Sequence, residues 1–281
     1  MVERRGRCWL AISPASFPFA RRLLENLMPA MNPWERLLDG KRLVAVAGAG
    51  GKKSTMYALA SRCSGRAGLT ATVHCPYPPP QFGAQVVVGE EATLLEAVRA
   101  TPREYRRVFF AQPGKQVDWA AGISPELVTQ IHAAHVFDLL LVKADGARRR
   151  LIKAPADGEP IYPPGTELVL YLVSAHALGR KLNSGVAHRL DEFMALTGAV
   201  EDTIIGPEHI VKLLTSTAGA LKGLAPEMRV VPVINRVDTP VRARLARDIA
   251  ERVLAISPRL DGVALACMGD AVPQMEFIER S

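Results

Sequence analysis

The feature that most constrains the fold is a series of short apolar runs that alternate with segments of helical spacing. Each run is apolar at almost every position, which is typical of a strand buried on both faces of a parallel sheet. The sequence therefore predicts an α/β fold in which a doubly wound, mainly parallel sheet lies between two layers of helices. The predicted strands lie at residues 43–47, 69–74, 86–88, 108–111, 137–143, 168–173, 230–234 and 263–266. The predicted helices begin near residue 33 and lie further at 54–63, 92–99, 125–134, 190–196, 207–214 and 241–255.

Composition excludes several classes of protein. Of the 281 residues, 48% are hydrophobic and 22% are charged, which is typical of a globular protein and excludes a disordered chain. The longest apolar runs, such as 168–173, are far shorter than the roughly 20 residues that span a bilayer, so we expect no membrane partner. The net charge is +7, but residues 1–42 hold eight basic residues against four acidic ones. The rest of the chain is only mildly basic, and we expect no nucleic-acid partner.

We expect one folded domain. Residues 1–31 are interrupted by prolines and serines and predict a flexible N-terminal extension, which leaves residues 32–281 as a single α/β domain. The four cysteines are scattered and form no CxxC pair, so neither a disulfide framework nor a zinc site is indicated. Unpaired cysteines are typical of a reducing compartment, and we expect a cytoplasmic protein.

A glycine-rich segment follows the first predicted strand and precedes a predicted helix. Its residues are Gly48, Ala49, Gly50, Gly51 and Lys52. In a phosphate-binding loop, glycines let consecutive N–H groups face a phosphate, a lysine reaches the β- and γ-phosphates, and a helix begins beside the anion. The sequence supplies these parts in this order, which favours a P-loop NTPase-like, Rossmann-like three-layer α/β/α domain. We therefore expect residues 48–55 to bind ATP or GTP, with Lys52 as a catalytic residue.

The residues after this lysine depart from the usual loop. A Ser or Thr normally follows the lysine, and its hydroxyl group holds Mg²⁺. Here Lys53 occupies that position, and an ammonium group cannot ligate a cation. Ser54 comes next, about 100° further round the helix, and Thr55 follows it. Either Mg²⁺ is held differently, by Ser54 and Asp145, or hydrolysis is impaired.

Asp145 follows the predicted strand at 137–143 and precedes Gly146 and Ala147. The carboxyl ends of parallel strands meet at one edge of a sheet, where ligands bind. At that edge, the Asp145 carboxylate can hold Mg²⁺ through water or orient a nucleophile, which makes it the second catalytic candidate. A tight turn also uses an aspartate followed by a glycine, so a structural role is the alternative.

A further polar pair, Asn235 and Asp238, follows the predicted strand at 230–234. Two such side chains on a strand-end loop can bind a purine base. A carboxylate accepts two N–H groups from guanine but cannot do so from the edge of adenine. Lysine is usual where Arg236 stands, so both bases stay open, and a simple turn before the next helix is the alternative interpretation.

Basic residues lie between these motifs. Arg148, Lys153, His188 and Arg189 are candidates for binding an anionic substrate or a second phosphate. Lys153 stands in a proline-rich segment, 151–164, that follows three consecutive arginines. A solvated run of charges is the alternative interpretation.

The motifs, in this order, resemble the YqeC family. That family has a G-A-G-G-K-T loop, a D-G-A strand end, a K-A-P segment and an N-K-x-D-like end. Here they stand at residues 48–52, 145–147, 153–155 and 235–238, within a similarity from about 34 to 268. The resemblance implies a cytoplasmic P-loop protein that acts in the maturation of selenium-dependent molybdenum hydroxylases, with the hydroxylase or its cofactor as partner. The chain departs from the family at Lys53, where Thr is usual.

Three functions stay open from the sequence. The first is a maturation factor that binds, and in one version hydrolyses, a nucleoside triphosphate. The second is a small-molecule kinase or an acyl-phosphate ligase, because the short loop also resembles that of amide-forming ligases. The third is a module that binds a nucleotide without hydrolysing it, which Lys53 favours. Whether the chain is an enzyme stays open as well.

Overall fold

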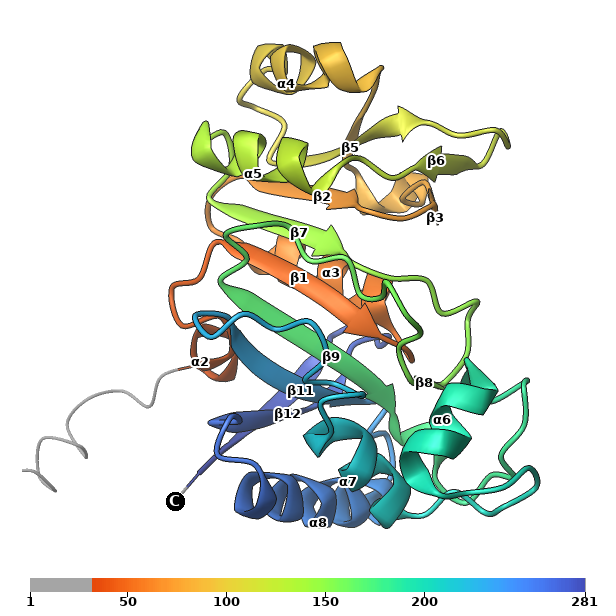
Figure 1. The fold of residues 1–281 in the computed structure, drawn as a ribbon. Helices are drawn as coiled ribbons and strands as arrows, with labels where there is room; N and C mark the ends of the chain where they lie inside the picture. The colour runs from red at the N-terminus through yellow and green to blue at the C-terminus, as the bar shows by residue number, and fades with distance from the viewer. Residues whose placement is uncertain (1–31, 281) are drawn as a thin grey trace, which may run out of the picture. The chain divides into compact units, whose positions relative to one another are not determined.

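A computed structural model describes residues 32–280, and from Pro33 onward these form one compact unit (Figure 1). The extension predicted for residues 1–31 lies outside the described residues, so this prediction stays untested. Within residues 32–280, every helix is too short or too polar to cross a membrane.

The helices agree with the predicted segments to within a few residues. They are α2 (Pro33–Leu38), α3 (Lys52–Arg62), α4 (Glu91–Ala100), α5 (Pro125–Ala133), α6 (Leu190–Thr197), α7 (Pro207–Thr215) and α8 (Pro240–Ile256), with the 3₁₀ helices η2 (Pro80–Phe82) and η3 (Ala175–Ala177). Hydroxyl side chains cap α5 and α8 at the positions that the sequence predicts. The Ser124 hydroxyl accepts the N–H of Leu127 at the start of α5, and the Thr239 hydroxyl accepts the N–H of Arg242 at the start of α8.

The strands include all the predicted apolar runs and several shorter pieces. They are β1 (Leu43–Gly48), β2 (Ala67–Ala71), β3 (Cys75–Pro76), β4 (Gln85–Val88), β5 (Arg107–Pro113), β6 (Trp119–Ala121), β7 (Leu139–Lys143), β8 (Ile152–Lys153), β9 (Leu168–Ser174), β10 (Ala187–His188), β11 (Arg229–Asn235), β12 (Gly262–Cys267) and β13 (Gln274–Glu279). The strand predicted at 69–74 is shorter than expected. It ends at Ala71, and the chain then enters β3, which pairs with β6.

Most of the strands form one large, mainly parallel sheet, as predicted. Its order is β13-β12-β11-β9-β1-β7-β2-β5-β6-β3, with β4 beside β5. All neighbours from β12 to β5 are parallel, whereas β13, β6 and β3 are antiparallel additions. β8 and β10 form a separate parallel pair. The carboxyl ends of β1, β7, β9, β11 and β12 therefore meet at the same edge of the sheet.

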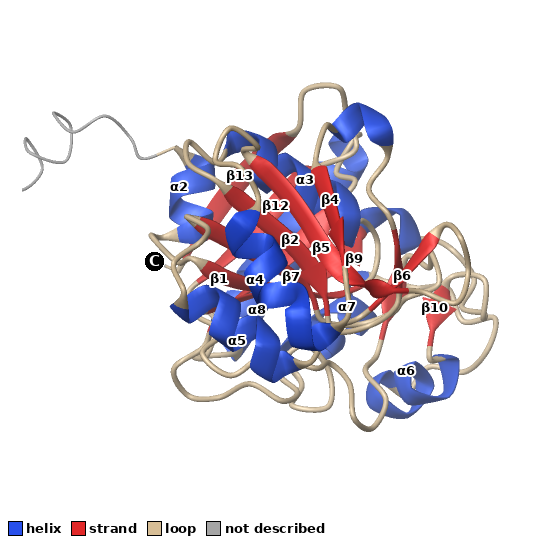
Figure 2. Cartoon of the chain, turned by 90° about the horizontal axis from the view of Figure 1, so that it is seen from above, coloured by secondary structure: helices blue, strands red, loops and turns tan. Residues whose placement is uncertain are grey.

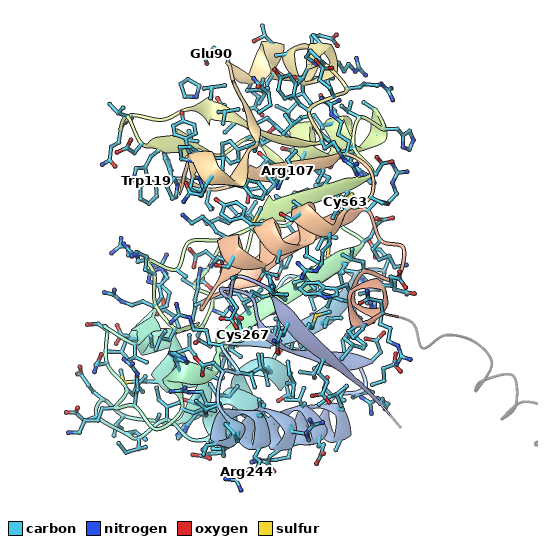
Figure 3. All side chains as sticks on the ribbon, turned by 180° about the vertical axis from the view of Figure 1, so that it is seen from behind. Cys63, Glu90, Arg107, Trp119, Arg244 and Cys267 are labelled. Atoms are coloured by element: carbon cyan, nitrogen blue, oxygen red, sulfur yellow. The ribbon has the colours of Figure 1, made fainter. Side chains whose placement is uncertain are left out.

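Helices cover both faces, so the fold is a three-layer α/β/α arrangement (Figure 2). Along β1, Val44 and Val46 belong to the core cluster that contains Met56 and Leu59 of α3. Figure 3, the view from behind, shows α3 across this face. The alternate residues of β1 face the opposite layer, where separate clusters contain α7 and α8, and α4 and α5. The strands are apolar on both faces because each face is covered.

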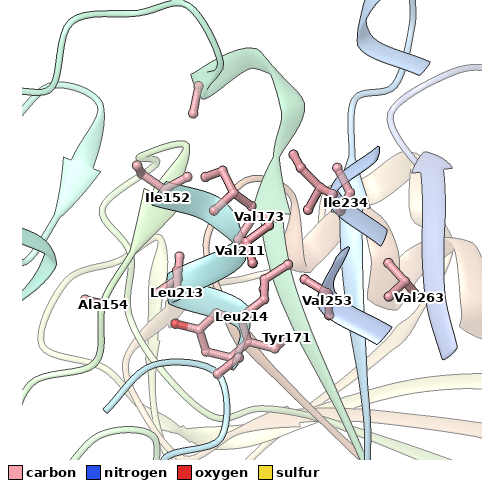
Figure 4. Close-up of a cluster of buried hydrophobic side chains, with 14 of the residues drawn as sticks. Ile152, Ala154, Tyr171, Val173, Val211, Leu213, Leu214, Ile234, Val253 and Val263 are labelled. Carbon is pink, nitrogen blue, oxygen red and sulfur yellow. The ribbon is translucent and has the colours of Figure 1, made fainter. Parts of the chain in front are cut away.

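The largest core cluster lies under α7 and α8. Figure 4 shows Tyr171 and Val173 of β9 beside Val211 and Leu214 of α7. The Tyr171 hydroxyl is fully buried and donates to the Lys153 carbonyl at 2.8 Å. This bond satisfies the one polar atom of the ring and anchors β8 to the sheet.

Candidate functional site

The loop between β1 and α3 has a conformation that requires glycine. Gly48, Gly50 and Gly51 have φ values of 81°, 87° and 130°, which residues with a side chain rarely adopt. The loop also has no room for a side chain at these glycines. A Cβ atom on Gly48 would lie 2.3 Å from the Leu172 carbonyl oxygen, and one on Gly51 would lie 2.1 Å from the Asn235 amide nitrogen. The glycines thus let the loop lie directly against β9 and the end of β11.

The backbone N–H groups of residues 50–54 have no acceptor among residues 32–280. The flanking groups are paired: the N–H of Ala49 donates to the Leu172 carbonyl at 2.8 Å, and the N–H of Thr55 donates to the Gly51 carbonyl at 3.0 Å. Unpaired N–H groups at the start of a helix carry partial positive charge and bind anions such as phosphate. The loop therefore offers a continuous set of donors for an anion.

Lys52, the first residue of α3, is only 6% exposed. Its Nζ lies 2.8 Å from Oδ1 of Asp145 and also donates a hydrogen bond to the Gly48 carbonyl. Burial lowers the pKa of Lys52, and the charge of Asp145 opposes this effect. The side chain thus folds back along the loop instead of extending into solvent.

Asp145 is fully buried just beyond β7. Its Oδ2 accepts the N–H of Gly48 at 3.1 Å and lies 2.9 Å from Nζ of Lys153. Its Oδ1 faces Lys52 at ion-pair distance, without the alignment of a hydrogen bond. Each carboxylate oxygen is therefore engaged by a lysine, and the residue joins the glycine loop to the segment after β7.

Lys153 is fully buried and continues the same network. Its Nζ lies 2.9 Å from Oε2 of Glu159 and donates to the Gly146 carbonyl at 2.7 Å. Oε1 of Glu159 in turn lies 3.2 Å from a guanidinium nitrogen of Arg189. Burial favours a raised pKa for Glu159, but the hydrogen bonds from Arg189 and Lys153 outweigh it and lower the pKa to about 2. Two of the predicted substrate residues, Lys153 and Arg189, thus belong to one chain of ion pairs.

Asn235 is almost completely buried at the end of β11. Its Nδ2 donates to the Gly50 carbonyl at 2.8 Å, and its Oδ1 accepts the N–H of Met268 at 3.0 Å. Both ends of the amide are thus engaged by the protein, and Asn235 joins the glycine loop to the end of β12. The predicted contact of Asn235 with a purine base stays a prediction.

Asp238 lies at the surface, and its side chain is 36% exposed. Its Oδ2 lies 2.7 Å from Nε2 of His176, and its Oδ1 lies 2.6 Å from a guanidinium nitrogen of Arg242. The hydrogen bond to His176 is the main cause of the lowered pKa of Asp238. Sequence reasoning missed His176, although its position just after β9 places it at the same edge of the sheet.

The remaining predicted substrate residues, Arg148 and His188, lie in different local structures. Arg148 and Arg149 follow Asp145 on a tight turn with left-handed φ values of 43° and 62°. His188 lies in β10, beside Lys153 of β8. Burial, together with the positive charges of Lys153 and Arg189, lowers the pKa of His188 to about 4.

The predicted magnesium ligands do not fit a directly bound cation in this arrangement. Both oxygens of Asp145 lie in ion pairs with lysines, so a cation would have to displace an ammonium group. Ser54 lies half-buried in the first turn of α3, directly after the exposed Lys53. Residues 32–280 also contain no group of three or more His, Cys, Asp or Glu side chains that could hold a metal ion.

Comparison with known proteins gives a family. A family model described as YqeC protein matches residues 44–191. The chain is 30% identical over 197 residues to a protein of Escherichia coli (strain K12) called "Uncharacterized protein YqeC", and the match covers 69% of this chain and 75% of the relative. No solved structure matches the chain. The region of the family match contains the glycine loop, Asp145, Lys153 and Arg189, and it ends before Asn235.

Proposed function

The chain belongs to the YqeC family, and on this basis we propose that it binds ATP or GTP in the maturation of a selenium-dependent molybdenum hydroxylase. Its partner in this proposal is the hydroxylase or the cofactor of that enzyme, and it acts in the cytoplasm. The folded domain works as a P-loop type nucleotide-binding unit.

The observation that carries the proposal is the run of unpaired N–H groups at residues 50–54 beside the buried ammonium group of Lys52. Helix starts and glycine loops of this kind are suited to the phosphates of a nucleotide. Lys52 adds a positive charge in surroundings that are poor in water, where electrostatic attraction is strong. The same edge of the sheet carries Asp145 and Asp238, as a doubly wound fold requires of a ligand site.

In the proposed complex, the N–H groups of the loop bind the β- and γ-phosphates, and Lys52 moves from Asp145 to the phosphates. Asp145 keeps two partners after this move, Nζ of Lys153 and the N–H of Gly48. Its negative charge therefore stays compensated, and it does not repel the phosphates strongly. Lys153 acts as a positioning residue that lets Lys52 change partners.

Asp238 is the base contact in this proposal, and Asn235 supports the loop. Asp238 is exposed just after β11, so two N–H groups of a base can replace its bonds to His176 and Arg242. Guanine offers two such groups to one carboxylate, and adenine does not. A comparison of GTP with ATP therefore tests the role of Asp238.

A second candidate is a module that binds the nucleotide without hydrolysing it. Lys53 favours this function, because it stands at the position of the hydroxyl that normally holds the metal ion, and Lys153 keeps Oδ2 of Asp145 engaged even when Lys52 moves to the phosphates. Assays of phosphate release from ATP and GTP separate the two functions. Release that depends on magnesium supports the hydrolase, and tight binding without release supports the module.

Calorimetry with ATP and GTP tests nucleotide binding itself. Lys52→Ala removes the ammonium group, and we expect the affinity to fall at least about tenfold, because charge-assisted hydrogen bonds contribute about 1.5–3 kcal/mol. Lys41→Ala, at the opposite end of β1, is the matched control and is expected to bind like the wild type. Equal affinities for Lys52→Ala and the wild type would exclude the glycine loop as the binding site.

A further inference from the structure

Three cationic residues stand on the glycine loop's helix and on the turn beside it, and none of them has an acidic partner in the described part of the chain. Lys53 is exposed in the first turn of α3, next to the unpaired N–H groups. Arg148 and Arg149 follow Asp145 on the turn that ends at Leu151. Within residues 32–280, none of these three cations lies in an ion pair. Like charges that gather without a counter-ion favour the binding of an anion.

The turn that carries the two arginines is fixed in place. The N–H of Arg150 donates to the Ala147 carbonyl at 2.8 Å, and the N–H of Leu151 donates to the Val186 carbonyl at 2.9 Å. The guanidinium of Arg150 also donates to the Ser184 carbonyl at 2.5 Å. These bonds hold Arg148 and Arg149 in their left-handed conformations.

This turn adjoins the glycine loop. The Leu151 carbonyl oxygen lies 2.7 Å from the position that a Cβ atom of Gly50 would occupy. Burial lowers the pKa of Lys53, the charge of Cys75 opposes this effect, and the positive charge of Arg149 adds to it, so Lys53 and Arg149 lie within electrostatic range of each other. Lys53 and the turn that carries Arg149 therefore adjoin the loop whose N–H groups are proposed to bind the phosphates.

The usual neutraliser of those phosphates is Mg²⁺, and the residues here do not suit it. The position of the metal-binding hydroxyl is taken by Lys53, and the buried carboxylate of Asp145 keeps its ion pair with Lys153 when Lys52 moves to the phosphates. Lys53 thus puts a positive charge at the sequence position whose side chain would otherwise hold the metal ion. Resting on the proposed nucleotide site, we propose that this loop binds a nucleoside triphosphate without Mg²⁺, with Lys53 and Arg149 neutralising its phosphates in place of the metal ion.

Calorimetry with ATP and GTP, in buffer with Mg²⁺ and in buffer with EDTA, tests this inference. For the wild type, the dissociation constants in the two buffers are expected to agree within about threefold, or to be lower in EDTA. Lys53→Thr restores a hydroxyl and removes a charge, so its affinity in EDTA falls about tenfold and Mg²⁺ recovers part of the loss. Arg149→Gln weakens binding in EDTA in the same direction.

Lys41→Thr is the matched control, because it makes the same replacement at the amino end of β1. It is expected to bind like the wild type in both buffers. Circular dichroism and thermal unfolding establish that each variant is folded, and Lys53 is exposed, so its replacement leaves the core intact.

Two results would overturn the inference while leaving the nucleotide site in place. One is wild-type binding that strengthens about tenfold or more when Mg²⁺ is added. The other is Lys53→Thr binding in EDTA as tightly as the wild type. Failure of the wild type to bind either nucleotide in both buffers would overturn the proposed function, and this inference with it.

Discussion

Lys153 is a charged residue whose full burial is compensated entirely by its neighbours. Its Nζ contacts Asp145, Glu159 and the Gly146 carbonyl. An ammonium group without hydration is costly unless such partners replace the water. Because one ammonium holds two carboxylates, its loss would remove the positive charge between them and leave Asp145 with Lys52 and Glu159 with Arg189.

We expect Lys153→Met to reduce the free energy of unfolding by about 3–5 kcal/mol, the usual cost of breaking a buried ion pair from one side. Urea unfolding measures it. The control is Lys181→Met, which breaks an exposed pair with Asp202 and should change stability by less than about 0.5 kcal/mol. Equal losses of unfolding free energy in the two variants would show that the buried ion pairs stabilise the fold no more than the exposed pair does.

His188 is expected to make stability depend on pH. Burial and the charges of Lys153 and Arg189 lower its pKa from 6.5 to about 4. The unfolded chain therefore binds more protons than the folded chain between these values, and stability falls as the pH is lowered through this window. In His188→Asn the fall should be smaller than in the wild type, as measured by urea unfolding at several pH values. Parallel curves for the two proteins would contradict the assignment.

Residue roles were predictable only in part. The sequence predicts that the glycine loop and Asp145 come together, and their contact through the N–H of Gly48 confirms it. Sequence spacing cannot show whether a polar group is already satisfied. Asn235 looks free at a strand end, but its amide is engaged by Gly50 and Met268, which are distant in sequence.

At the scale of elements, the sequence pattern predicts those strands that are buried on both faces. The apolar runs predicted the central strands because both faces of these strands are covered. β13 escaped prediction because its residues are half-exposed at the edge of the sheet, where an antiparallel partner alone orders it. β8 and β10 are two-residue strands and leave no periodic signal.

The connection from β1 to α3 gives a prediction at this scale. Gly51→Ala places a Cβ atom 2.1 Å from the Asn235 amide at a φ of 130°, so we expect a loss of about 1–3 kcal/mol in stability and loss of nucleotide binding. Gly146→Ala is the control, because a Cβ atom there meets open space. Thermal unfolding and calorimetry measure both effects. A Gly51→Ala protein as stable as Gly146→Ala would show that the loop tolerates a side chain.

For the molecule as a whole, the strand order predicts which strands are most protected from local unfolding. β1 lies between β7 and β9 and is buried at every position, whereas β4 and β13 lie at the margins of the sheet. Hydrogen exchange followed by mass spectrometry should therefore show the slowest exchange in β1, β7 and β9 and faster exchange in β4 and β13. Uniform exchange rates across the sheet would contradict this order.

The two hydrogen bonds of the Asn235 amide limit how far the chain can be shortened without losing the conformation of the glycine loop. The amide joins Gly50 to Met268 and comes 185 residues after that glycine. A fragment trimmed to residues 44–191 would carry the complete glycine sequence but would lack this brace. The glycine loop therefore cannot be transferred on its own, because its conformation depends on contacts with the last third of the chain.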